Sequence, residues 1–240
     1  MSGHSKWATI KRQKEATDSQ RGKAFSKISR TISLAAKSGT DPETNFKLRI
    51  ALQQAKQVNM PKENILRAIK RGSGEVKGEN WEEITFEGYG PSGVGIILEV
   101  VTDNKNRSTA EIKNLFERVG GSLTGPGAVA YQFKKIGLIK IEKNPQSSEQ
   151  ILKLMDFGVE DVNEGEEIIE VVTVPEELNQ IRDKIVNAGM VIREAGLSFQ
   201  PQSWLKIDNP QSRQQLSRFI KSLEEREDVQ NVYLNVEENQ

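Results

Sequence analysis

A glycine-rich run at residues 72–78 separates two stretches of the chain that carry different hydrophobic periods. Before this run, apolar residues recur at the three-to-four-residue spacing of one face of an α-helix. After it, apolar and polar residues alternate as they do in half-buried strands, and helical segments come between these strands. The two periods demand different elements, so the sequence predicts an α+β fold in which a helical part precedes a part with sheets.

The stretch before the glycine-rich run contains three expected helices. The first covers residues 20–38 and has an apolar stripe on one side. The second begins at Asp41-Pro42, with Asp41 as N-cap and Pro42 at the first helical position. The third begins at Pro61 and ends at Gly72, which we expect to be the C′ residue. Three such helices predict a small bundle with a basic tail outside it.

The stretch beyond the run predicts strands and helices in an order that implies an insertion. The expected strands cover residues 81–89, 94–102, 129–133, 138–142, 168–174, 191–194, 197–199, 204–207 and 231–236, and the expected helices cover residues 108–119, 148–157, 175–188 and 211–225. The elements of residues 81–133 lack a second helix and a closing strand, and the end of the chain supplies both.

We therefore predict three domains. The first is a basic helical domain with tail and linker, residues 1–78. The second is a discontinuous α/β domain of residues 79–134 and 202–240, and the third is an inserted ferredoxin-like α/β domain of residues 135–201. Both α/β domains are expected to be plaits of one sheet and its helices.

The charges of the chain are segregated although their sum is zero. Residues 1–74 contain 16 Lys and Arg against 5 Asp and Glu, a net charge of +11; the whole chain has 34 of each, so residues 75–240 contain 18 against 29, a net of −11. A solvated basic helix face accounts for an excess of a few cations. An excess this large favours phosphate binding, which depends steeply on the number of cations. The N-terminal part is therefore expected to bind nucleic acid.

The candidate binding residues are cations with one indole and one imidazole among them. Single-stranded or folded RNA is bound by cations beside an aromatic ring on which a base stacks, and Trp7 among the tail lysines fits this pattern. Trp7 fits equally an apolar anchor that docks the tail on the helices. The candidate set is His4, Lys6, Trp7, Lys11, Arg12, Lys14, Arg21, Lys23, Lys27, Arg30, Lys62, Arg67, Lys70, Arg71 and Arg107.

Arg107 is the one candidate outside the helical part. It ends the run Thr102-Asp103-Asn104-Lys105-Asn106-Arg107 between an expected strand and an expected helix. Turn and cap roles for Asp103 and Asn104 are favoured there over a phosphate contact. The sequence shows no helix-turn-helix signature, so we expect recognition of shape and backbone rather than of bases in a groove.

Residues for catalysis are scarce. The chain has no cysteine and one histidine, His4, which lies in the tail, and its carboxylates show no metal-loop spacing. The glycines at residues 88–95 and 120–127 match neither phosphate-loop nor dinucleotide patterns, which favours turns and close packing. We expect no enzyme, no cofactor, no metal and no small-molecule substrate.

The location and assembly expected from the sequence are those of a cytoplasmic monomer. No apolar run approaches the roughly 18–20 residues of a membrane helix, and the N-terminus resembles neither a secretory signal nor a mitochondrial transit peptide. We therefore expect no membrane partner.

Five segments resemble the YebC/PmpR family. They are residues 3–11 (GHSKWATIK), 59–65 (NMPKENI), 68–72 (AIKRG), 83–91 (EITFEGYGP) and 102–107 (TDNKNR). The resemblance covers essentially the whole chain and extends to a mitochondrial relative, the translational activator of cytochrome c oxidase. It implies a helical N-terminal domain, two α/β domains of which one is discontinuous, a cytoplasmic location and no catalytic residues. Two departures stand out: Gln13 where the family is usually basic, and Ala128 where a serine often stands.

The resemblance implies two alternative functions. In the first, the protein is a ribosome-associated factor that binds ribosomal RNA and helps elongation through stalling sequences such as proline runs. In the second, it is a transcriptional regulator that binds promoter DNA. The tail with one tryptophan and the lack of a groove-reading helix favour the first.

Overall fold

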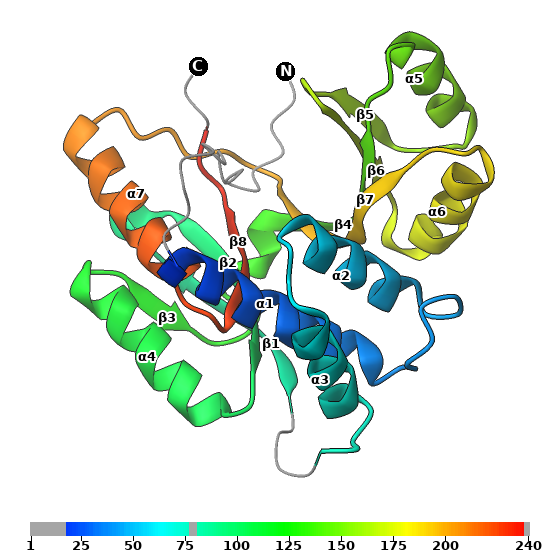
Figure 1. Cartoon of the computed structure of the whole chain (residues 1–240). Helices are drawn as coiled ribbons and strands as arrows, with labels where there is room; N and C mark the ends of the chain where they lie inside the picture. Colours follow the sequence, from blue (N-terminus) through cyan, green and yellow to red (C-terminus); the bar gives the residue numbers. More distant parts are fainter. Residues whose placement is uncertain (1–17, 77–80, 238–240) are drawn as a thin grey trace. The chain divides into compact units, whose positions relative to one another are not determined.

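Figure 1 shows the computed structural model, which describes residues 18–76 and 81–237. The predicted α+β class is confirmed, since three N-terminal helices precede two four-stranded sheets. Contacts divide the chain into two compact units, one of residues 134–200 and one of the described residues before 134 and after 200. The further division of the larger unit into a helical and a sheet domain stays a prediction. No helix in the described ranges is both long and apolar enough to cross a membrane.

The three N-terminal helices of the larger unit share one core. They are α1 (Asp18–Ala36), α2 (Phe46–Gln57) and α3 (Lys62–Gly72). The core combines large side chains, such as Ile32 and Leu48, with small ones, such as Ala51 and Ala68. Each of these four residues is at most 1% exposed. Small side chains at the contacts let the helix axes approach closely.

The start of α2 differs from the prediction. Asn45, not Asp41, is the N-cap, and its side-chain oxygen accepts a hydrogen bond from the backbone N–H of Leu48 at 3.0 Å. The Asn45 amide also donates to the backbone oxygens of Ala35 and Gly39 at 2.8 and 2.7 Å. A buried amide that both caps α2 and ties it to the end of α1 outweighs the local Asp-Pro signal.

The predicted role of Gly72 is also wrong. Gly72 is the last residue of α3, and the left-handed conformation falls on Gly74, at φ 81°. A Cβ on Gly72 would lie 2.1 Å from the backbone oxygen of Ser33 and 2.7 Å from the Cβ of Ala36. Glycine is therefore required here because α1 and α3 touch.

The sheet of the larger unit is antiparallel, with strand order β3-β1-β2-β8. Its strands are β1 (Glu82–Tyr89), β2 (Gly95–Thr102), β3 (Ser122–Thr124) and β8 (Val229–Leu234). The helices α4 (Lys105–Arg118) and α7 (Pro210–Glu224) pack against it through Phe116 and Phe219, whose rings meet edge to face at 5.0 Å. The last strand of the chain thus completes a sheet begun more than one hundred residues earlier, and the last helix packs against that sheet, as predicted.

Two segments of this unit that the sequence predicts as strands, residues 129–133 and 204–207, do not form strands in the structure. Residues 129–133 form the short 3-10 helix η2 (Ala130–Gln132) and the first residue of the next strand, and the third strand is β3 instead. The N–H groups of Val129 and Ala130 donate to the buried Glu87 carboxylate and are not available to a ladder. The strand expected at residues 204–207 is reduced to one bridge between Leu205 and Val236.

The smaller unit has the ferredoxin-like βαββαβ order, with strands arranged β5-β6-β4-β7. Its elements are β4 (Phe133–Glu142), α5 (Ser147–Asp156), β5 (Asp161–Glu164), β6 (Ile168–Thr173), the 3-10 helix η3 (Pro175–Glu177), α6 (Leu178–Asn187) and β7 (Ile192–Pro201). The sequence does not predict β5, which has one apolar residue, Val162, and it predicts two strands separated at Gly196 where the structure has β7.

Candidate nucleic-acid interface

The described part of the chain contains only some of the predicted binding residues. His4, Lys6, Trp7, Lys11, Arg12 and Lys14 lie outside the described residues, and so does the side chain of Arg21. The remaining candidates lie on α1 (Lys23, Lys27, Arg30), on α3 (Lys62, Arg67, Lys70, Arg71) and at the start of α4 (Arg107).

Two of the α1 cations hold this helix against the loop between α7 and β8. The Lys27 Nζ donates to the backbone oxygen of Glu224 at 2.6 Å, and Arg30 pairs with the Glu227 carboxylate at 3.0 Å. Glu224 is the last residue of α7, where a helix has unsatisfied carbonyls and the negative end of its dipole. Lys27 therefore satisfies the end of a helix that lies 197 residues further along the chain.

Burial at this contact disfavours the charged forms of both the Lys27 and the Glu224 side chains. Burial lowers the pKa of the Lys27 ammonium, against the attraction of the Glu224 and Asp228 carboxylates, which would raise it. Burial likewise raises the pKa of the Glu224 carboxyl despite the nearby Lys27. Desolvation outweighs attraction on both sides, as in other buried pairs. Lys27 is therefore half-buried and already bonded to the end of α7, which makes it a weaker candidate for contact with a ligand than an exposed cation.

The α3 cations face the opposite way from the helix core. Lys62, Arg67 and Lys70 are exposed, whereas Ala68 on the other side of α3 is fully buried. Within the described ranges, none of these three cations forms a salt bridge. We call these three residues the α3 cationic face.

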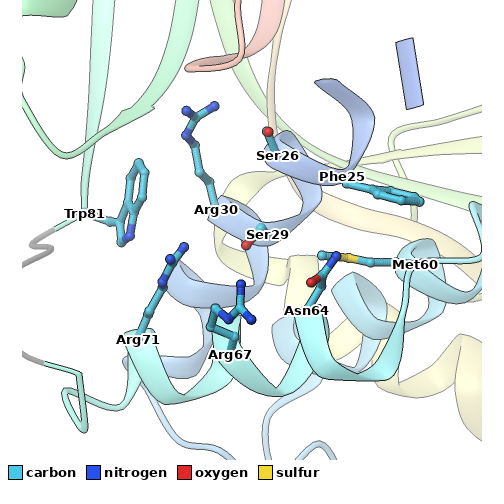
Figure 2. A pocket seen from close by; sticks show the side chains of 9 residues that line it. All are labelled: Phe25, Ser26, Ser29, Arg30, Met60, Asn64, Arg67, Arg71 and Trp81. Carbon is cyan, nitrogen blue, oxygen red and sulfur yellow. The ribbon is translucent and has the colours of Figure 1, made fainter. Parts of the chain in front are cut away.

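A pocket of about 220 Å³ opens beside this face, between α1, α3 and the residue that precedes β1 (Figure 2). Three guanidinium groups line it, and none of the described lining residues is a carboxylate. In Figure 2, Trp81 with Arg30 and Arg71 lies at one end of the pocket, and Phe25 with Met60 lies at the other. The lining residues are Phe25, Ser26, Ser29, Arg30, Met60, Asn64, Arg67, Arg71 and Trp81. We call this the α1–α3 pocket.

Two side chains of the α1–α3 pocket carry buried donors that are not hydrogen-bonded. Trp81 is 8% exposed, and its Nε1 has no acceptor among the described residues. The same holds for Nε and Nη1 of Arg30, whose side chain is 15% exposed. The Arg30 guanidinium carbon lies 5.2 Å from the centre of the Trp81 ring, a cation–π contact that keeps the two groups together.

Arg107 takes part in the turn and helix-cap contacts that the sequence favours at this segment. Its guanidinium pairs with the Asp103 carboxylate at 2.5 Å, and its backbone N–H donates to the Asn104 side chain, the N-cap of α4. The loop Gly125-Pro126-Gly127 is held to β1 through Glu87. The buried Glu87 carboxylate accepts from the N–H groups of Gly127, Val129 and Ala130 at 2.7 to 2.8 Å.

The sequence predicts the α3 cations as binding residues but not most of the α1–α3 pocket. It predicts Trp81 only as part of a strand, and it gives no binding role to Asn64 or Ser29. The one available signal was an indole directly after the linker, where an aromatic side chain can pack back on the preceding helices. Among the described residues, no group of three or more His, Cys, Asp or Glu side chains could hold a metal ion.

Two family models match consecutive parts of the chain. The model described as "TACO1/YebC protein N-terminal domain" matches residues 5–75, and the model described as "TACO1/YebC second and third domain" matches residues 81–236. The unmatched residues between them are 76–80, and they begin within the glycine-rich run of residues 72–78.

Similar proteins match over nearly the full length. A protein of Pelotomaculum thermopropionicum is 44% identical over 99% of both chains, and one of Syntrophus aciditrophicus is 46% identical over 98% of this chain and 95% of its own. Both are named "Probable transcriptional regulatory protein". The crystal structure of a conserved hypothetical protein from Aquifex aeolicus has a TM-score of 0.85 and 42% identity, and the match covers 98% of this chain and 97% of that one.

Proposed function

The chain belongs to the TACO1/YebC family, and on this premise we propose that it regulates gene expression by binding nucleic acid, without catalysing a reaction. We further propose that the α3 cationic face and the basic tail make the contact, and that ribosomal RNA is the target. The role would be to assist elongation through stalling sequences, such as proline-rich ones.

The observation that carries this proposal is the contrast between the cations of α1 and those of α3. Lys27 and Arg30 are occupied in holding the larger unit together. Lys62, Arg67 and Lys70 are exposed and form no salt bridge within the described residues. Three unneutralised cations on one helix face attract a phosphate backbone, and the release of counterions drives the binding.

RNA is favoured over DNA by the chemistry of the same region. In the sequence, Trp7 lies among the lysines of the basic tail, and basic side chains beside an aromatic ring suit unstacked bases and an irregular backbone. The exposed side chains of α3 include Leu66, at 58%, between the cations, and an apolar side chain there has no base edge to read in a B-form groove except a thymine methyl.

Promoter DNA is the second candidate, because relatives that are 44–46% identical are named transcriptional regulatory proteins. The same α3 cationic face would then contact the duplex backbone. A regulator of this kind must prefer its site over random DNA by about 10³-fold or more.

Two measurements on the full chain test the proposal. The first follows sedimentation with ribosomes through a sucrose gradient near physiological salt. The second follows the affinity for a fluorescent single-stranded RNA as salt is raised. The double variant Lys62→Gln with Lys70→Gln should sediment less with ribosomes, and its slope of log affinity against log salt should fall by about 1.4, or roughly 0.7 for each lost phosphate contact.

A charge-matched control separates this surface from net charge. Lys105→Gln with Lys153→Gln removes two exposed lysines elsewhere, and it should leave both readouts near the wild type. If the two double variants behave alike, the α3 cationic face is not the contact. A wild-type protein that stays at the top of the gradient, yet selects one promoter fragment over competitor DNA, would replace the RNA proposal with the DNA one.

A further inference from the structure

The α1–α3 pocket has the lining of a site for an anion. It brings together the guanidinium groups of Arg30, Arg67 and Arg71, and none of the described residues that line it is a carboxylate. Glu227 pairs with Arg30 from outside the lining. Arg67 is exposed and forms no salt bridge within the described ranges. Guanidinium groups bind phosphate through planar, charge-assisted hydrogen bonds.

The buried donors of this pocket point to the same ligand. Buried N–H groups in folded proteins are almost always hydrogen-bonded, because an unsatisfied one is costly. Trp81 Nε1 and two nitrogens of Arg30 break this rule within the described residues, and both side chains line the pocket. A small shift of either side chain presents the donor to an acceptor in the pocket. A phosphate oxygen is such an acceptor.

The size of the pocket and the chemistry of its two ends further restrict the class of ligand that it can bind. Its volume of about 220 Å³ is below the roughly 300–1,000 Å³ of pockets that bury a drug-sized ligand, so part of a bound nucleotide would lie outside the pocket. The end with Trp81 and Arg71 is cationic, whereas the end with Phe25 and Met60 is apolar, with the Asn64 amide beside it (Figure 2). A single nucleotide has the matching parts, an anionic phosphate and a flat base with polar edges.

We infer that the α1–α3 pocket binds one nucleotide, with its phosphate at Arg67, Arg71 and the Trp81 indole N–H and its base toward Phe25. This inference rests on the proposed function, since a nucleotide of a bound RNA is its natural source. A free nucleotide offers the same phosphate, and the experiment separates the two sources.

The test follows the indole N–H of Trp81 by NMR in the full chain labelled with ¹⁵N-tryptophan, and Trp81→Phe assigns the resonance. The probes are adenosine 5′-monophosphate, adenosine without phosphate, and a short single-stranded RNA. Adenosine monophosphate and adenosine are each titrated to about 10 mM, because a ligand with so few contacts is expected to have a millimolar dissociation constant. Adenosine monophosphate and the RNA should both move the Trp81 resonance, and adenosine should not.

The matched variants are Arg67→Gln, which removes a charge inside the pocket, and Lys70→Gln, which removes one from the same helix outside it. Arg67→Gln should weaken adenosine monophosphate on the order of tenfold, as expected for one lost charge-assisted hydrogen bond. Lys70→Gln should leave that affinity unchanged while it weakens RNA. Both residues are exposed, and an unchanged Trp204 resonance confirms that each variant is folded.

The outcomes distinguish this inference from the proposed function. If adenosine monophosphate moves Trp81 but RNA does not bind, the pocket takes a free nucleotide, and the proposed function fails while the site stands. RNA binding that leaves the Trp81 resonance in place, together with no effect of adenosine monophosphate, overturns the pocket and leaves the proposed function. An equal effect of adenosine and its monophosphate also overturns it, because the phosphate would then not be recognised.

Discussion

Replacement of Gly72 by alanine tests how closely α1 and α3 are packed. A new Cβ would lie 2.1 Å from the Ser33 backbone oxygen and 2.7 Å from the Ala36 Cβ. Neither atom can rotate away, so the helices must separate by about 1 Å to restore van der Waals contact. Overpacking of this kind costs about 1–3 kcal/mol, whereas the helical preference of alanine over glycine returns about 0.5–1 kcal/mol. Because backbone blocks relaxation, we expect a net loss of roughly 2 kcal/mol.

Gly22→Ala is the matched control. Gly22 is also helical, in α1, but no atom of the described residues lies within 4 Å of the Cβ that it would acquire. The same chemical change should therefore stabilise α1 by about 0.5–1 kcal/mol through the reduced freedom of the unfolded chain. The two glycines are alike in local sequence terms, and only the contact with α1 separates their outcomes.

Hydrogen exchange of the α1 and α3 amides measures both effects where they arise. The chain has two units, so one global unfolding midpoint does not report on this contact alone. A loss of about 2 kcal/mol in Gly72→Ala corresponds to roughly 30-fold faster exchange in these helices, and Gly22→Ala should slow exchange in α1. Protection in Gly72→Ala equal to or above that of the wild type would refute the packing argument.

Three further predictions concern buried polar groups. Glu87→Gln should lower the free energy of unfolding by roughly 1.5–3 kcal/mol at neutral pH. Burial raises the pKa of the Glu87 carboxyl, but three backbone donors outweigh burial and hold the pKa below its ordinary value. The contribution of the carboxylate to stability is therefore present above the ordinary pKa, and urea titrations should show that it vanishes as pH falls through the lowered pKa. Asn45→Ala should destabilise the start of α2 by about 1–2 kcal/mol, seen as faster amide exchange there, and unchanged exchange would contradict the cap. Burial raises the pKa of Asp228, but Arg226, the Ser108 hydroxyl, which donates to this carboxylate at 2.6 Å, and a backbone donor outweigh it and lower the pKa. Ser108→Ala should therefore raise this pKa in a carboxyl NMR titration; an unmoved pKa would assign the lowering to Arg226 and the backbone donor.

Much of the fold could be predicted because local patterns carry it. The apolar stripes of α1, α4 and α7 have helical spacing, and the order of elements showed that the end of the chain completes the first sheet. The misses have tertiary causes. β5 pairs along β6 although its own sequence is polar, since a neighbouring strand supplies the hydrogen bonds that its side chains do not predict.

The candidate site shows the same limit at the level of single residues. Arg30 and Arg67 are equivalent in the sequence, as arginines of two amphipathic basic helices. In the structure Arg30 pairs with a carboxylate 197 residues away and lies against Trp81, while Arg67 faces solvent at the rim of the α1–α3 pocket. No window along the chain contains the partner that makes this difference.

The sequence by itself determined the α+β class, the family and the concentration of positive charge before residue 75, because composition, period and motifs are properties of the chain alone. Only the tertiary structure decided which cations are spent on packing, why Gly72 must be a glycine, and that Trp81 joins the arginines around one pocket. The physical reason is that burial and hydrogen-bond partners depend on residues brought together from distant parts of the chain, and these set whether a charge stabilises the fold or remains free for a ligand.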